Sequence, residues 1–230
     1  MKDFNGERMK KFLTALMLAV LVPLCADAAK YEPIPTQVKK PVKYTQDYID
    51  EISAVYKKTG DNQLFFVALD MLKGTTGEFS RNAILGDNLT GKPVKIEFKD
   101  LTEINPEYGS FDAVGWKRKS TLYIYINPKH KNAPPAALAA LLAHEALHQD
   151  EFNSLSEETY AWTMEATVWY EMLQKYPELE TLDEPLVKRE NILKQLFEKG
   201  NYSNKYIKKN VYANKGYKGL PISSPGFESL

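Results

Sequence analysis

The spacing of apolar residues predicts two helices in the first part of the chain. Residues 45–60 repeat apolar side chains at the interval of one helix face, and Gly60 ends this pattern. Residues 61–74 predict a second helix, for which Asp61 or Asn62 would provide the N-terminal cap. Both segments are therefore expected to bury one face against the rest of a domain.

The pattern changes from a helical to a strand period in the middle of the chain. Residues 94–98, VKIEF, alternate strictly between apolar and polar. Residues 111–127 contain two β-rich runs around a charged turn, which predicts a hairpin. We expect these strands to form a small, mostly antiparallel sheet.

The helical period returns after Asn127. Residues 132–150 place two prolines where a first helical turn tolerates them and continue with strong helix formers. Residues 154–176 and 183–200 predict two further helices, and Gly200 ends the second of them. Helices around a small sheet predict an α+β fold with a helical C-terminal part.

The first 28 residues have the pattern of a secretory signal peptide. Lys10 and Lys11 precede an apolar run of 13 residues, 12–24. This run is shorter than the roughly 20 residues that a membrane-spanning helix needs. Small residues at 26 and 28 predict cleavage after Ala28. We therefore expect an exported protein, periplasmic or secreted, without stable membrane insertion once the signal is removed.

The remaining chain is expected to contain one domain. Residues 29–43 are polar and interrupted by prolines, which indicates an extended leader. Residues 44–200 hold the predicted helices and strands, and residues 201–230 form a tail rich in Tyr, Lys, Asn and Gly. Met9 begins a cleaner signal than Met1, which indicates Met9 as an alternative start of translation.

Composition excludes some classes of function. Lys plus Arg and Asp plus Glu each total 30. The chain therefore lacks the excess of basic charge that is typical of nucleic-acid-binding proteins. The only cysteine, Cys25, lies in the predicted signal, so the mature chain has neither a disulfide nor a thiolate metal ligand. An exported chain without disulfides is typical of a bacterial envelope protein.

The segment HEALH, residues 144–148, has residue types and a spacing that indicate a metal-binding site. On a helix, His144 and His148 lie one turn apart on the same face and can direct imidazole nitrogens at one metal ion. Glu145 is rotated from His144 by about 100°, beside the metal rather than on it. It is therefore our candidate general base, which would take a proton from a metal-activated water.

A catalytic zinc ion needs a third protein ligand, for which we expect a carboxylate. If helices 132–150 and 154–176 form an antiparallel hairpin, Glu158 faces His148. Glu157 fits a capping box with Ser154, which gives it a structural task. Glu165 would lie one turn beyond His144, where it suits the support of a ligand. We favour Glu158 as the ligand and keep Glu157 and Glu165 as alternatives.

Three other residues near this segment are expected to have structural roles. Trp162 and Trp169 share the helix face of Glu158, and we expect them to belong to the core rather than to bind substrate. His130, a single histidine among lysines before a proline pair, is expected to lie in a loop.

The combination of HEALH with the downstream EETYA resembles the gluzincin type of zincin metallopeptidases. In these enzymes HExxH is completed by a Glu on the next helix, often in an E-x-x-A pattern, which Glu158 and Ala161 match. The resemblance covers about residues 90–175, and the nine residues between His148 and Glu158 are fewer than in the best-known gluzincins. It implies a zincin-like fold and one Zn²⁺ per chain. It also implies that Glu145 activates water, and that a peptide binds along an edge strand, for which we expect Ala113–Trp116.

Two other functions share these residues. A binding module on a zincin scaffold would need the histidines but not Glu145. A zinc hydrolase of non-peptide amides, such as cell-wall material, would use the same ligands. We favour an exported zinc metallopeptidase that acts on a peptide or protein substrate. The residue that would stabilise the oxyanion stays open among the many tyrosines.

Overall fold

The computed structural model describes residues 44–228, which belong to one compact unit. The predicted signal peptide, residues 1–28, and leader, residues 29–43, lie outside the described residues. Among residues 44–228, no helix combines the length and the apolar character that crossing a membrane requires.

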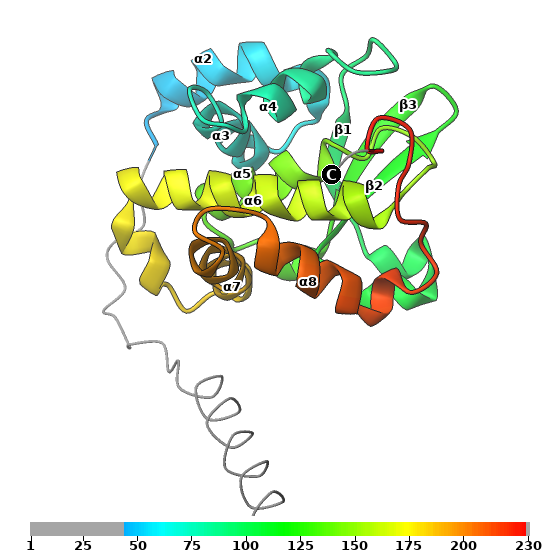
Figure 1. Ribbon diagram of the computed structural model, residues 1–230. Coiled ribbons are helices and arrows are strands. Elements are labelled where there is room, and N and C mark those ends of the chain that lie inside the picture. The colour runs from blue at the N-terminus through cyan, green and yellow to red at the C-terminus, as the bar shows by residue number, and fades with distance from the viewer. Residues whose placement is uncertain (1–43, 229–230) are drawn as a thin grey trace, which may run out of the picture. The chain divides into compact units, whose positions relative to one another are not determined.

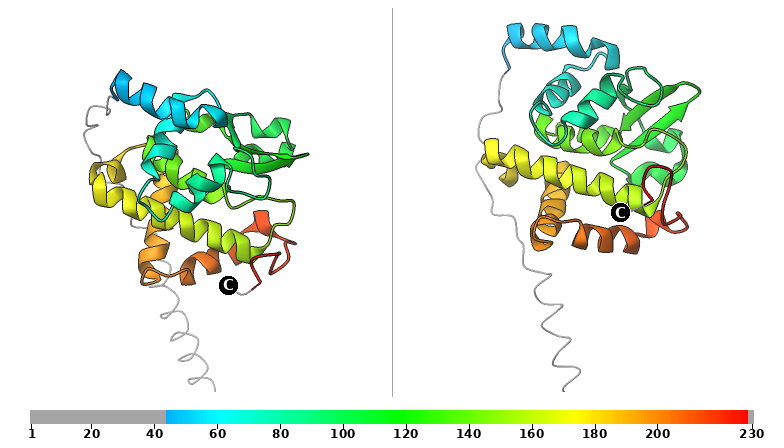
Figure 2. Two further views of the ribbon diagram at one scale, coloured as in Figure 1. Left: turned by 90° about the horizontal axis from the view of Figure 1, so that it is seen from above. Right: turned by 45° about the horizontal axis from the view of Figure 1, so that its top comes forward.

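Helices and a small sheet build the described part of the chain, which confirms the α+β prediction (Figure 1). The helices within residues 44–228 are α2 (Gln46–Tyr56), α3 (Gln63–Met71), α4 (Glu78–Leu85), α5 (Pro135–Glu145), α6 (Leu155–Lys175), α7 (Pro185–Lys199) and α8 (Lys205–Ala213). In the views of Figures 1 and 2, α5 and α6 occupy the middle, with α2 to α4 on one side and α7 and α8 on the other.

The strands form one mixed sheet in the order β1-β3-β2. They are β1 (Lys95–Phe98), β2 (Ala113–Arg118) and β3 (Thr121–Ile126). The predicted hairpin is confirmed, because β2 pairs antiparallel with β3. The expectation of a mostly antiparallel sheet is wrong, because β1 pairs parallel with β3. Residues 99–112 connect β1 to β2 at the end of the sheet where both Phe98 and Ala113 pair with Ile126. Since β3 lies between β1 and β2, β2 lies at an edge of the sheet.

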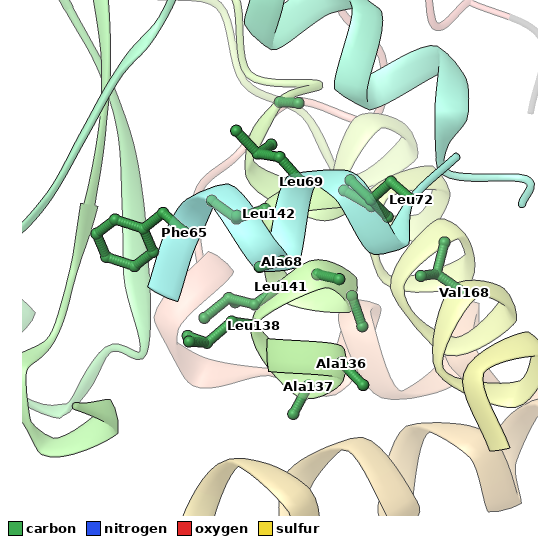
Figure 3. Packing of buried hydrophobic residues seen from close by; sticks show 14 of the residues in the cluster. Phe65, Ala68, Leu69, Leu72, Ala136, Ala137, Leu138, Leu141, Leu142 and Val168 are labelled. Carbon is green, nitrogen blue, oxygen red and sulfur yellow. The ribbon is translucent and has the colours of Figure 1, made fainter. Parts of the chain in front are cut away.

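Helix α5 lies at the centre of the hydrophobic core. Every residue from Ala136 to Glu145 is buried, as expected of a helix that is apolar all round. Figure 3 shows Leu69 of α3, and Leu72 just after this helix, in one cluster with Leu138 and Leu142 of α5. The same cluster includes the inward-facing residues of the sheet. The core thus holds the C-terminal end of α5 firmly against its neighbours.

The described residues after Gly200 include a helix. Helix α8 buries Ile207 and Val211 in a second apolar cluster with Leu193 and Phe197 of α7. The sequence patterns did not predict this helix, nor α4, since each is short and mostly polar. α4 is anchored by Ser80, whose hydroxyl donates to the carbonyl oxygen of Ala143 at 2.7 Å.

Helix boundaries agree with the prediction to within a few residues, and the largest difference lies at a functionally important place. Asn62 caps α3 and Ser154 caps α6. Helix α5 ends at Glu145, whereas the sequence predicted a helix that continued through His148. The main chain then tightens, because Leu147 N donates to His144 O and His148 N donates to Glu145 O. This change of pitch is common at helix ends, where carbonyl groups lack helical partners.

Candidate metal centre

His144, His148 and Glu158 come together between the end of α5 and the start of α6. Their potential ligand atoms all lie within 4.8 Å of one another, so the three can hold a metal ion. The Nε2 atom of His144 lies 3.9 Å from Glu158 Oε2, and that of His148 lies 3.7 Å from Glu158 Oε1. The three residues brought together are those that the sequence predicted.

His148 reaches this place from outside the helix. We expected both histidines on one face of a continuous α-helix, but His148 follows the end of α5. The tightened turn still brings the two imidazole rings to a centroid distance of 5.2 Å. The predicted meeting of the two side chains is therefore correct, although the backbone conformation that produces it is different.

Each histidine is held by a carboxylate of α6 through its Nδ1 atom. His144 Nδ1 lies 2.9 Å from Glu165 Oε2, and His148 Nδ1 lies 2.9 Å from Glu157 Oε1. A carboxylate that accepts the Nδ1 proton leaves the Nε2 lone pair free for a metal. Glu165 thus occupies the supporting position expected for it.

Glu157 has a different task from the one predicted. Its main-chain N–H donates to the Ser154 hydroxyl at 3.1 Å, as in a capping box. The carboxylate does not return to the Ser154 N–H, which instead donates to Asn153. It contacts His148 and accepts a hydrogen bond from Ser224. The capping box is therefore only half formed, because the buried histidine takes the carboxylate.

A chain of charges continues behind Glu165. Arg189 of α7 donates to both oxygens of Glu165, and its Nε forms an ion pair with Asp112 Oδ2 at 3.0 Å. Glu165 is fully buried. Burial raises the pKa of Glu165, but the charges of Arg189 and His144 outweigh burial and lower this pKa to about 2. Arg189 therefore keeps Glu165 ionised beside His144.

The two oxygens of Glu158 differ in their hydrogen bonds. Its Oε1 accepts from Asn153 at 2.7 Å, whereas Oε2 is buried and makes no hydrogen bond of normal geometry among the described residues. Burial raises the pKa of this carboxyl group, but the neighbouring His148 and His144 outweigh burial and lower the pKa. The Tyr217 hydroxyl is near enough to this carboxyl group to help lower its pKa. A buried, charged oxygen is costly unless it is compensated, and a cation between Glu158 and the two Nε2 atoms would compensate it.

Glu145 borders the same space without making a close contact. Its Oε1 lies 3.8 Å from His144 Nε2, and only 6% of the residue is exposed. Burial raises the pKa of Glu145. For His148, burial lowers the pKa, but hydrogen bonding to Glu157 and the charges of Glu158 and Glu145 raise it to about 9. The carboxylates around the imidazoles therefore create a site that favours positive charge.

A cavity of about 440 Å³ gives access to this group from solvent. Residues 113–117 of the edge strand β2 form one wall, and the loop residues Asp150 and Phe152 form another. Tyr217, from the C-terminal part of the chain, closes a third side. An adjoining cavity of about 290 Å³ shares His144, Glu145 and Tyr217 and extends to Arg189. The strand expected to bind a peptide thus lines the cavity that contains the three clustered residues.

Sequence patterns missed Tyr217 as part of the site. Trp162 Nε1 donates to the Tyr217 hydroxyl at 3.0 Å. Burial and the charge of Glu158 raise the pKa of Tyr217. Trp169 is fully buried, as expected, whereas Trp162 is only partly buried and lines the smaller cavity. The signal was weak because 14 tyrosines occur in the chain.

His130 lies in the connection between β3 and α5, as expected, but it is buried. This residue ends the short 3₁₀ helix Pro128–His130 and is 1% exposed. Its Nε2 lies 2.7 Å from Asp112 Oδ1, and its Nδ1 lies 3.8 Å from Glu184 Oε1. The sequence did not predict the carboxylates around His130, because Asp112 and Glu184 come from distant parts of the chain.

Comparison of the chain with known proteins gives no match to a family model, to a curated protein or to a solved structure. The functional argument therefore rests on the residues and geometry of this site.

Proposed function

We propose that the protein is a zinc-dependent hydrolase that cleaves peptide bonds and holds one Zn²⁺ per chain through His144, His148 and Glu158. The observation that carries the proposal is the buried Glu158 Oε2, which makes no hydrogen bond of normal geometry within residues 44–228 and lies close to two imidazole Nε2 atoms. Two imidazole nitrogens and one carboxylate oxygen are a ligand set of catalytic zinc sites, which keep a fourth position for water or substrate. The absence of cysteine from residues 29–230 is consistent with this set.

The chemistry assigned to the chain centres on Glu145. When bound, zinc would supply a Lewis acid that polarises a carbonyl group and makes water more acidic. Glu145 takes the proton from the attacking water and delivers it to the leaving nitrogen. Burial, which raises the pKa of this carboxyl group, brings its basicity closer to what both transfers require. Glu157 and Glu165 keep the histidines oriented throughout.

A peptide is the substrate class that the cavity wall favours. Among the described residues, strand β2 pairs with β3 alone, so its other edge carries main-chain groups without strand partners in this part of the chain. Residues 113–117 of this strand line the cavity next to Glu145. An extended peptide can pair with such an edge through main-chain hydrogen bonds. We therefore propose that the substrate lies along β2 with its scissile bond near Glu145.

The proposal is tested by Glu145→Gln, which keeps the shape of the side chain and removes the base. The variant should retain about one zinc per chain, yet lose peptide hydrolysis by at least about 10²-fold, the usual contribution of a positioned base. Glu151→Gln is the matched control, because Glu151 lines the same cavity but is exposed and paired with Lys117. It should retain both zinc and activity.

Three results would contradict parts of this proposal. Full hydrolysis by zinc-loaded Glu145→Gln would exclude the assigned base. Loss of zinc in that variant would make Glu145 a ligand. If zinc-loaded wild type cleaves a panel of cell-wall amides but nothing in a broad peptide library, the substrate class is wrong. Inactivity on both would favour a binding module.

Export is part of the same proposal and rests on the pattern of residues 1–28. The mature protein should begin at Ala29. N-terminal sequencing of the product from an exporting host checks this, and a membrane-bound product that retains Met1 or Met9 would contradict it.

A further inference from the structure

The last residues of the described chain cross the start of α6. We call Leu220–Phe227 the C-terminal strap. Leu155 N donates to Pro221 O at 2.9 Å, and Ser156 N donates to Ile222 O at 3.0 Å. These two N–H groups belong to the first turn of the helix, which has no helical acceptors for them. The strap therefore provides main-chain caps that α6 itself lacks.

A buried serine of the strap continues this contact with its side chain. Ser224 is 6% exposed, and its hydroxyl donates to Glu157 Oε2 at 2.9 Å. The hydroxyl groups of Ser154 and Ser224 also lie 2.9 Å apart. Since the Ser154 oxygen accepts the Glu157 N–H, one consistent arrangement has Ser154 donating to Ser224 and Ser224 donating to Glu157. The hydrogen bonds then form a closed, buried ring.

Glu157 connects this ring of hydrogen bonds to the candidate metal centre. Glu157 uses its second oxygen, Oε1, to hold Nδ1 of His148 at 2.9 Å. The next residue, Glu158, is the carboxylate between the two histidines. One helical turn thus carries both the support of His148 and the third metal-facing residue. The position of this turn depends on the strap, because helix ends open more easily than helix centres.

We infer that the C-terminal strap is a positioning element of the metal site, and that Ser224 acts through Glu157 to fix the orientation of His148. This inference rests on the proposed function, because it takes His148 as a metal ligand. His144 has an equivalent support from within the body of the domain, where Arg189 holds Glu165. His148 depends instead on Glu157, which is held by Ser224, a residue 67 positions further along the chain.

The chain offers a matched pair of serines for the test. Ser224→Ala removes the buried hydroxyl, while Ser223→Ala removes an exposed hydroxyl one residue earlier. Zinc affinity is measured by competition with a chromophoric chelator, on full-length mature protein. Ser224→Ala should bind zinc about 10–100-fold more weakly, the usual effect of losing a partner behind a metal ligand. Ser223→Ala should bind like wild type.

A second readout separates positioning from a general loss of stability. Co²⁺ in place of zinc reports ligand geometry through its visible absorption spectrum. Ser224→Ala should change this spectrum, and its amides 155–158 should exchange hydrogen faster, while the metal-free protein melts within a few degrees of wild type. Glu157→Gln changes the acceptor of the Ser224 hydrogen bond and should also weaken zinc binding. This variant tests the inference if Ser224→Ala fails to fold.

The outcomes distinguish this inference from the proposed function. If wild type binds no zinc, the proposed metal site is wrong and the inference falls with it. If wild type binds zinc while Ser224→Ala and Ser223→Ala share its affinity and Co²⁺ spectrum, the metal site stands and the role of the strap is excluded. Equal binding by wild type and Glu157→Gln would exclude it as well.

Discussion

Gly115 and His148 lie so close together that a β-carbon on Gly115 would come within 2.8 Å of the β-carbon of His148. The same atom would lie 3.4 Å from the carbonyl oxygens of Glu145 and His148. Strand β2 therefore packs directly on the turn that follows α5. Glycine is required here by contact rather than by an unusual backbone angle.

Gly115→Ala should displace His148 and weaken metal binding. Because the clash is with a β-carbon, no flexible side-chain end can move aside. We expect a loss of about 1–3 kcal/mol in the free energy of unfolding, typical of overpacking, measured by urea denaturation. Zinc affinity should fall by at least about 10-fold, as when a ligand loses its support. Arg118→Ala, on the exposed end of the same strand, is the control. Unchanged affinity in Gly115→Ala would show that His148 does not bind the metal from this position.

The three carboxylates near the histidines should respond differently to substitution. Glu158→Ala removes the metal-facing oxygen and should abolish tight zinc binding, leaving two neutral imidazoles. Glu157→Ala and Glu165→Ala remove supports and should weaken binding by about 10–100-fold. Calorimetric titration with zinc gives this order directly. Tight binding by Glu158→Ala, with loss in one of the other two variants, would move the third ligand to that residue.

The sequence predicted the residues of the site because their relation is local. His144, Glu145 and His148 lie within five positions, and Glu158 follows after a short connection. Helical periodicity constrains such neighbours even where the helix end is misplaced. The prediction of a continuous helix through His148 failed because periodicity does not show where a helix tightens and ends.

The residues that complete the site from a distance could not be predicted. In the sequence, Arg189 has the pattern of an ordinary charged position on an amphipathic helix. Ser224 is one of several serines near the end of the chain. Both contact carboxylates of α6 that lie 24 and 67 positions away. Only the packing of α7 and the strap on α6 brings these groups together. The parallel pairing of β1 was missed for the same reason, since pairing partners are not encoded in alternation alone.

Arg189→Met should strongly destabilise the metal-free protein. It leaves Glu165 fully buried without its cationic partner, and breaking a buried ion pair from one side costs about 3–5 kcal/mol. The free energy of unfolding from urea titration at neutral pH measures this loss. Lys188→Met is the control, because Lys188 and its partner Asp183 are exposed, and such pairs contribute about 0–1 kcal/mol. A loss below 1 kcal/mol in Arg189→Met would show that Glu165 does not depend on this contact.

The buried pair of His130 and Asp112 predicts a pH-dependent contribution to stability. Burial alone would lower the pKa of His130, but the hydrogen bond to Asp112 and the nearby carboxylate of Glu184 outweigh it and raise the pKa above 6.5. The neighbouring Lys129, which also contacts Asp112, opposes this increase. Because the folded state binds the proton more tightly than the unfolded state, protonated His130 stabilises the fold.

His130→Gln should therefore destabilise the protein more at acidic than at alkaline pH. The stabilisation by His130 is fully present below its unfolded pKa of 6.5 and disappears as the pH rises through the raised pKa of the folded state. At pH 5 the variant should lose about 1.5–3 kcal/mol, the contribution of a hydrogen bond to a charged group. Urea denaturation of both proteins between pH 5 and 9 gives the difference, in which the other titrating groups largely cancel. A difference that stays constant or grows with pH would mean that His130 is neutral in the folded protein, so that Asp112 holds it by an uncharged hydrogen bond.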